Sequence, residues 1–136
     1  MKTNLKIFLI IAITMIAVNI NAQIYSYKAT EVQFTNLEEN GEWSEWSEAT
    51  KTDILIDCTN ELNTIRINSA DIQIYNKIKD LDDAISDDGT PIKQIQYLDK
   101  DGIKCIIMIF KISKTASLLQ ICYADFLILY TVESLH

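Results

Sequence analysis

The sequence predicts an all-β domain: an antiparallel up-and-down meander of eight or nine short strands curled into a small barrel, with a two-sheet sandwich as the alternative. The first observation is composition, because short runs rich in Ile, Val, Thr, Tyr and Phe favour a pleated, half-buried surface. The second is connection length, because the breaks are too short for the crossovers that parallel strands need. The third is edge protection, since closing a sheet pairs the backbone groups of its edges.

Nine runs have the character of strands. Ile54, Ile56 and Cys58 alternate with polar residues, as a strand with one buried face requires. The runs 106–110 and 126–130 are apolar throughout, which favours central strands covered on both faces. The expected strands are 24–36, 42–50, 52–58, 63–68, 72–78, 93–99, 103–113, 118–124 and 126–133.

Short polar breaks separate these strands. The chain has three glycines, Gly41, Gly89 and Gly102, and each follows Asn or Asp. Such pairs adopt the positive φ angles that tight hairpins need. Two further breaks, 59–61 and 113–117, are polar and contain no glycine.

The segment 72–85 has a second interpretation. Apolar residues recur there at helical spacing, namely Ile74, Ile78, Leu81 and Ile85. Short apolar runs do not separate a strand from a buried helix by period alone. We therefore expect a strand in the first half of this segment, with an amphipathic helix as the alternative.

The N-terminus has the layout of a secretory signal peptide. Lys2 and Lys6 precede an unbroken apolar run at 7–18, and a short polar segment ends at Ala22. That run is shorter than the roughly 20 apolar residues of a spanning helix, so cleavage is favoured over a membrane anchor. We expect residues 1–22 to be removed, residues 23–136 to form one β domain without a membrane span, and the protein to be periplasmic or extracellular.

The charge excludes one class of partner. The chain has 12 basic and 19 acidic residues, and loss of Lys2 and Lys6 would make the remainder more acidic still. Such a surface repels phosphate backbones, so no nucleic acid is expected as a partner. A protein or a surface polymer remains as the expected kind of partner.

No constellation of residues predicts catalysis or a cofactor. His136, the single histidine, is the last residue, so neither a serine nor a cysteine nucleophile has a held base. Three scattered cysteines do not match zinc spacings. The acidic stretches 80–89 and 99–102 lack the spacing of a calcium loop. We expect no enzyme activity, no cofactor and no metal.

The three cysteines lie in apolar runs. An odd number cannot pair completely within one chain, and a free buried cysteine behaves as a small hydrophobe. Either all three stay reduced, or one disulfide forms. In the second case Cys105 and Cys122 are the expected pair, because their strands are predicted neighbours.

Aromatic residues are the candidate contact sites. The stretch 43–47 reads WSEWS, and residues three apart face opposite sides of a regular strand. One tryptophan is therefore expected in the core and the other in solvent, unless a bulge turns both to one side. An outward Trp43 or Trp46, together with Tyr25 and Tyr27, would supply contacts to a partner.

Two resemblances involve this stretch. WSEWS is similar to the WSxWS box of cytokine-receptor fibronectin domains and to the tryptophan runs of thrombospondin-type repeats. The chain has one arginine, Arg66, three cysteines and an early box, so we interpret this match as coincidental. As a whole the chain resembles small, uncharacterised exported β-rich proteins with an N-G-x-W-S-x-W strand, here residues 40–46. The resemblance also rests on Asp101-Gly102 and on the stretch 123–130, and it implies no activity.

Two functions remain open after these exclusions. The first is a non-enzymatic interaction module that uses outward aromatic residues. The second is a small lipocalin-like carrier with an apolar ligand inside the barrel, although bulky interior side chains would fill a barrel of this size.

Overall fold

Strands account for most of the computed structural model, which describes residues 23–135. The expected signal peptide, residues 1–22, and His136 lie outside the described residues. The elements are β1 (Ile24–Asn36), β2 (Thr50–Thr59), the 3₁₀ turn η1 (Asn60–Leu62), β3 (Thr64–Ile67), β4 (Gln73–Asp80), β5 (Ala84–Ile85), β6 (Pro91–Asp99), β7 (Lys104–Lys111), β8 (Ala116–Cys122) and β9 (Phe126–Ser134).

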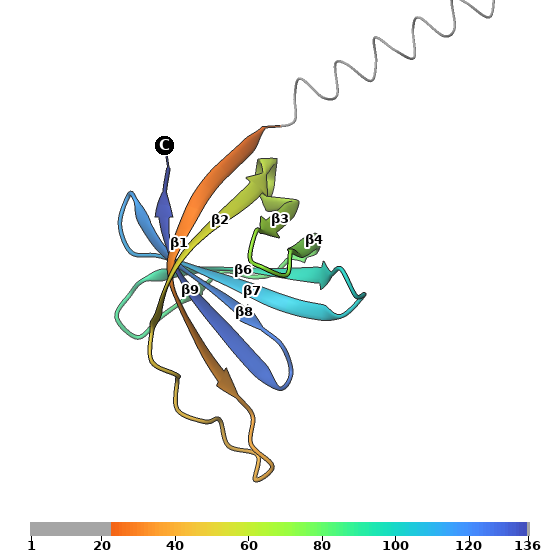
Figure 1. The fold of residues 1–136 in the computed structure, drawn as a ribbon, viewed down its shortest axis with the longest axis vertical. Helices are drawn as coiled ribbons and strands as arrows, with labels where there is room; N and C mark the ends of the chain where they lie inside the picture. Colours follow the sequence, from red (N-terminus) through yellow and green to blue (C-terminus); the bar gives the residue numbers. More distant parts are fainter. Residues whose placement is uncertain (1–22, 136) are drawn as a thin grey trace, which may run out of the picture.

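The strands form one antiparallel sheet that closes on itself. Its order is β4-β3-β2-β1-β9-β8-β7-β6-β5, and β4 also pairs with β6 (Figure 1). Eight strands thus form a closed up-and-down barrel, which confirms the predicted all-β class and barrel. The ninth strand, β5, pairs with the start of β6 beyond the end of β4.

The barrel has two distinct ends. We call one the mouth: it contains the start of β1, the turn η1, the β7–β8 connection and the end of β9. We call the other the arm end, because the β1–β2 connection, residues 37–49, extends from it as an arm (Figure 1).

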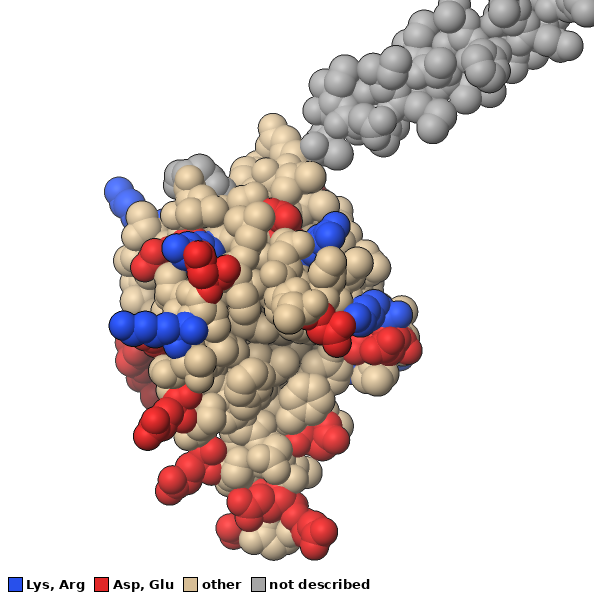
Figure 2. Space-filling model, viewed as in Figure 1, with Lys and Arg blue, Asp and Glu red and all other residues tan. Residues whose placement is uncertain are grey.

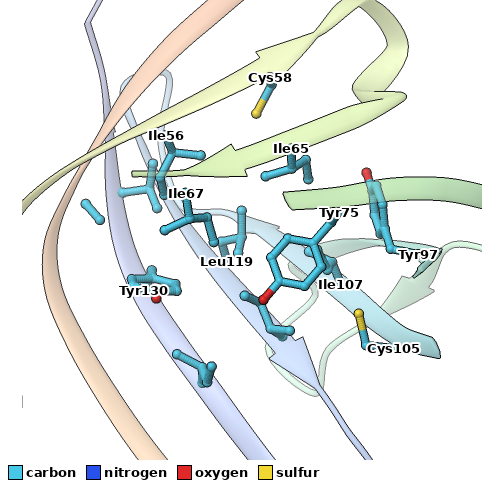
Figure 3. Close-up of a cluster of buried hydrophobic side chains, with 14 of the residues drawn as sticks. Ile56, Cys58, Ile65, Ile67, Tyr75, Tyr97, Cys105, Ile107, Leu119 and Tyr130 are labelled. Atoms are coloured by element: carbon cyan, nitrogen blue, oxygen red, sulfur yellow. The ribbon is translucent and has the colours of Figure 1, made fainter. Parts of the chain in front are cut away.

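Inward-facing side chains fill most of the barrel. Ile56, Ile67 and Tyr75 point into the interior with residues from the opposite wall (Figure 3). Burying each such side chain contributes about 1.5–3 kcal/mol. An eight-stranded barrel is just wide enough for side chains to fill, and here isoleucine and tyrosine do most of the filling.

The three glycine turns share one hydrogen-bond pattern. The N–H groups of Gly41, Gly89 and Gly102 each donate to the carbonyl three residues earlier, in Glu38, Ser86 and Asp99. All three glycines have φ between 81° and 85°. This is the geometry of a hairpin loop with a left-handed glycine, so the turns predicted from Asn-Gly and Asp-Gly are confirmed.

Two expectations about secondary structure are wrong. Residues 42–49 form no strand, apart from a single bridge between Leu37 and Trp43. The helical alternative for 72–85 is also wrong, because β4 pairs on one side with β3 and on the other with β6. Within β4, Tyr75 faces the core of the barrel while Ile78, three residues further on, is exposed, as in a strand.

Candidate functional site

The arm, residues 37–49, is the largest irregular segment among the described residues. A tight turn closes its tip, where the Glu38 N–H donates to the Glu42 carbonyl at 2.7 Å. The Leu37–Trp43 bridge continues this short hairpin. The tip of the arm is therefore a structured turn.

Two serines attach the arm to the edge of β1 beyond its last pair with β2, Val32–Thr50. The Ser44 N–H donates to the Asn36 carbonyl, and the Ser47 N–H donates to the Phe34 carbonyl, both at 2.8 Å. The serine hydroxyls accept from the N–H groups of the same two β1 residues. Thr35 lies beneath this attachment, and its hydroxyl donates to the Ser44 carbonyl at 2.6 Å. Serine hydroxyls readily replace ladder hydrogen bonds in this way.

The serine attachment leaves both tryptophans exposed. Trp43 retains 45% of its accessible surface and Trp46 retains 40%. The expectation that one of the two would enter the core is wrong, because serines make the contacts to β1. Phe34, at the end of β1, is 49% exposed. These side chains place an apolar group on a protruding segment.

Carboxylates accompany the exposed aromatics. The sequence has no lysine or arginine between Lys28 and Lys51, and the arm carries Glu38, Glu39, Glu42, Glu45 and Glu48. Figure 2 shows acidic side chains at the tip of the arm. Among the described residues, no ion pair involves the arm. Its negative charge therefore faces solvent.

The two candidate tyrosines lie at the mouth, far along the barrel from the tryptophans. Tyr25 is opposite Cys58 at the rim, and its hydroxyl donates to the Gln23 side chain. Tyr27 is half-buried against the core and opposite Ile56. Burial, followed by the nearby Cys58 and Tyr25, raises the pKa of Tyr27. Tyr27 thus faces the interior, and the four aromatic residues do not form one surface.

At the arm end, a network of polar side chains closes the barrel. The Tyr75 hydroxyl donates to Gln73, whose amide donates to the Tyr130 hydroxyl at 3.2 Å. The Tyr123 hydroxyl donates to Asp99 at 2.8 Å. A shallow hollow of about 120 Å³ lies above them. The polar groups bond to one another, so the network stabilises the fold and offers few free groups to a ligand.

At the mouth, a second hollow of about 150 Å³ enters the barrel. Its wall is mostly apolar and comes from opposite sides of the barrel. The apolar lining consists of Ile56, Cys58, Ile65, Ile109, Leu119 and Val132. The turn η1 borders it through Leu62.

The structure does not support a Cys105–Cys122 disulfide. Cys105 is opposite Tyr97 and faces the interior, whereas Cys122 is opposite Ile106 on the outer face. The Cys122 sulfur lies 3.7 Å from that of Met108, also outside. All three cysteines are free. Adjacent strands bring the two residues close, but their side chains lie on opposite sides of the wall and cannot bond without backbone movement.

Metal-binding groups and reactive thiols are two features that catalysis often uses. Within residues 23–135, no group of three or more His, Cys, Asp or Glu side chains is placed to hold a metal ion. Burial, followed by the charge of Asp57, raises the pKa of Cys58 to about 12, and burial is also the main cause that raises the pKa of Cys105 to about 11. Both therefore remain protonated thiols at neutral pH, which are poor nucleophiles.

Comparison with known proteins adds no family. No family model matches the chain, and neither curated proteins nor solved structures give a significant match. In the part of the chain that the structure describes, no helix is long and apolar enough to cross a bilayer.

Proposed function

We propose that this chain is a non-enzymatic interaction module, exported after removal of residues 1–22, that binds a partner through the arm. The observation that carries the proposal is the pair of exposed tryptophans on a segment held in place by backbone and serine hydrogen bonds. Tryptophan is enriched among the residues that dominate binding energy at interfaces. A segment that is already ordered also loses less conformational entropy on binding.

The negative charge of the arm indicates what kind of surface its partner has. Five glutamates surround Trp43 and Trp46, so the complementary surface is basic and has an apolar pocket for an indole ring. A protein, or a cationic polymer at a cell surface, has this chemistry. Association through such an arm weakens as salt rises, because exposed charges are screened.

Affinity purification from the protein's own export compartment tests this function. The tagged wild-type chain is compared with Trp43→Ala, Trp46→Ala and a control, Ile85→Ala, which removes an exposed apolar side chain near the mouth. We expect one reproducible partner that is recovered by wild type and control and lost with either tryptophan variant. Direct titration of that purified partner in increasing salt completes the test. Equal affinity for wild type and both tryptophan variants would contradict the proposal.

The alternative function, carriage of an apolar ligand, is supported by the hollow at the mouth. Pockets for drug-sized ligands usually measure about 300–1,000 Å³. The mouth hollow is about 150 Å³, and packed side chains occupy the barrel beyond it. A lipid-sized ligand therefore does not fit the interior, and the interaction module is the better-supported function.

A further inference from the structure

The hollow at the mouth differs from the rest of the interior because side chains leave it unfilled. Ile65 and Leu119 are buried in its wall, and Ile109 is half-buried near its opening. An apolar cavity of about 150 Å³ is large enough for one benzene-sized molecule. The volume inside the hollow therefore matches about one aromatic ring.

The chemistry of the wall selects for an uncharged molecule. No Asp, Glu, Lys or Arg lines the hollow. The lining residues with polar side-chain groups are Tyr27, Cys58 and Ser117, whose hydroxyl or thiol groups are neutral at physiological pH. A charged ligand would lose its hydration here without gaining a partner of opposite charge.

A strained turn borders the hollow. Glu61 and Leu62 have φ of 59° and 58°, the left-handed region, although neither is glycine. This conformation costs about 1–2 kcal/mol per residue. Two side chains hold it: the Lys77 ammonium donates to the Glu61 carbonyl at 2.6 Å, and the Tyr97 hydroxyl donates to the Leu62 carbonyl at 2.7 Å.

The result of this strain is the position of Leu62. The leucine packs against the core cluster and forms part of the wall of the hollow. Backbone strain that the surrounding structure maintains is characteristic of ligand clamps and active sites. Here it keeps an apolar side chain at the edge of an apolar cavity.

We propose that the mouth hollow is a binding site for a compact, uncharged, apolar molecule of about one aromatic ring, with Leu62 held at its edge by the strained turn. The site is at the opposite end of the barrel from the arm and does not depend on the proposed interaction function. Its contacts are apolar packing from both sides of the barrel, and Tyr27 and Ser117 are the neutral hydroxyl-bearing residues of the lining.

Benzene is the probe for this site, and methyl NMR is the measurement. Benzene is titrated into the mature protein while the methyl resonances of Ile109, Leu119 and Val132 are followed. Ser117→Phe places a ring in the hollow from the inward face of β8. Leu118→Phe, at the next residue on the outward face, is the matched control.

We expect saturable shifts at the three methyl groups in wild type and in Leu118→Phe, and their loss in Ser117→Phe. Ile109→Trp, a second filling variant at the opening, replaces Ser117→Phe if the latter lacks the wild-type circular dichroism spectrum. Absent or non-saturable shifts in wild type would overturn the proposal, as would shifts that persist in a folded filling variant. Saturation of the same methyl groups by hexadecanoate would overturn the size limit. A Trp43→Ala/Trp46→Ala double variant should bind benzene as wild type does, so failure of one proposal leaves the other standing.

Discussion

Replacing Tyr97 by Phe tests the link between the barrel interior and the turn η1. Tyr97 is fully buried, with 0% of its surface accessible, and its hydroxyl donates to the Leu62 carbonyl at 2.7 Å. The substitution removes this hydrogen bond and keeps the aromatic ring. The packing of the core therefore changes little, and the measured effect reports the hydrogen bond.

The expected loss of stability follows from two contributions. A hydrogen bond between neutral groups contributes a net stabilisation of about 0.5–1.5 kcal/mol. A buried acceptor left without a donor costs about 1–3 kcal/mol. Leu62 is half-buried and not fully buried, so we take the second contribution at its low end. We expect Tyr97→Phe to lower the free energy of unfolding by about 1–2 kcal/mol. The melting temperature should then fall by roughly 4–8 °C.

Urea unfolding followed by far-UV circular dichroism measures this loss. Tyr25→Phe is the control, because it removes a hydroxyl whose hydrogen bond to Gln23 lies on the surface, and it should change the free energy of unfolding by less than about 0.5 kcal/mol. Hydrogen exchange should also accelerate at the Asn63 and Thr64 amides in Tyr97→Phe. Equal stability of the two variants, with unchanged exchange at the turn, would refute the idea that Tyr97 holds η1.

Three further predictions concern strain, thiols and pH. Glu61→Gly should raise the free energy of unfolding by about 0.5–1 kcal/mol in urea titrations, because relief of a left-handed φ exceeds the added entropy of the unfolded chain; a destabilised variant would contradict this. Thiol titration should find all three cysteines unreactive in the native protein at pH 8 and three free thiols per chain in denaturant without reductant; a single free thiol would demonstrate a disulfide. Burial raises the pKa of Asp99, but hydrogen bonds from the Ile103 N–H, the Tyr123 hydroxyl and the Asp101 N–H, with the charge of Lys100, outweigh it, so the folded-state pKa lies below the ordinary value. This stabilisation is present above the unfolded pKa and is lost as pH falls through the folded pKa. Asp99→Asn should therefore lose less stability than wild type between about pH 5 and about pH 2, and an unchanged pH dependence of unfolding would disprove the role of Asp99.

The local sequence pattern of strands and turns predicts the barrel because the structure pairs the same runs of residues over long range. The expected first strand, 24–36, has the bounds of β1, where β-branched and aromatic residues recur along the whole run. The three glycine turns were recognisable because only a few dipeptides tolerate positive φ. Closure of the sheet followed from edge protection, a global argument that no single residue carries.

The strand prediction from sequence is wrong where side chains replace the hydrogen bonds of a β-ladder. Residues 42–50 have the composition of a strand, yet Ser44 and Ser47 bind β1 through their hydroxyls and leave Trp43 and Trp46 outside. The two-residue strand β5 was missed because Ala84 and Ile85 extend the edge of β6 after an interruption at 81–83. Both features depend on what a neighbouring strand offers, which a local window does not contain.

For the same reason, the sequence predicts one candidate site, the exposed tryptophans, and does not predict the other, the hollow at the mouth. The spacing of the two tryptophans predicts that one of them faces solvent, and the structure exposes both. The hollow at the mouth was missed, since it depends on residues from several strands and on the backbone of η1. Its one local signal is the polar break at 59–61, at the end of which Glu61 and Leu62 adopt left-handed φ without being glycines.

The pairing of the first strand with the last makes the barrel a fold with high contact order. Tyr27 pairs with Ser134, and the two are separated by almost the whole described chain. Loop-closure entropy opposes such contacts, so barrel closure should be slow and should come late in folding. A chain emerging with its N-terminus first presents β1 long before β9 exists, and until then β1 and β8 each have an unpaired edge. Truncation before residue 126 would therefore yield an aggregation-prone open sheet and no smaller stable domain.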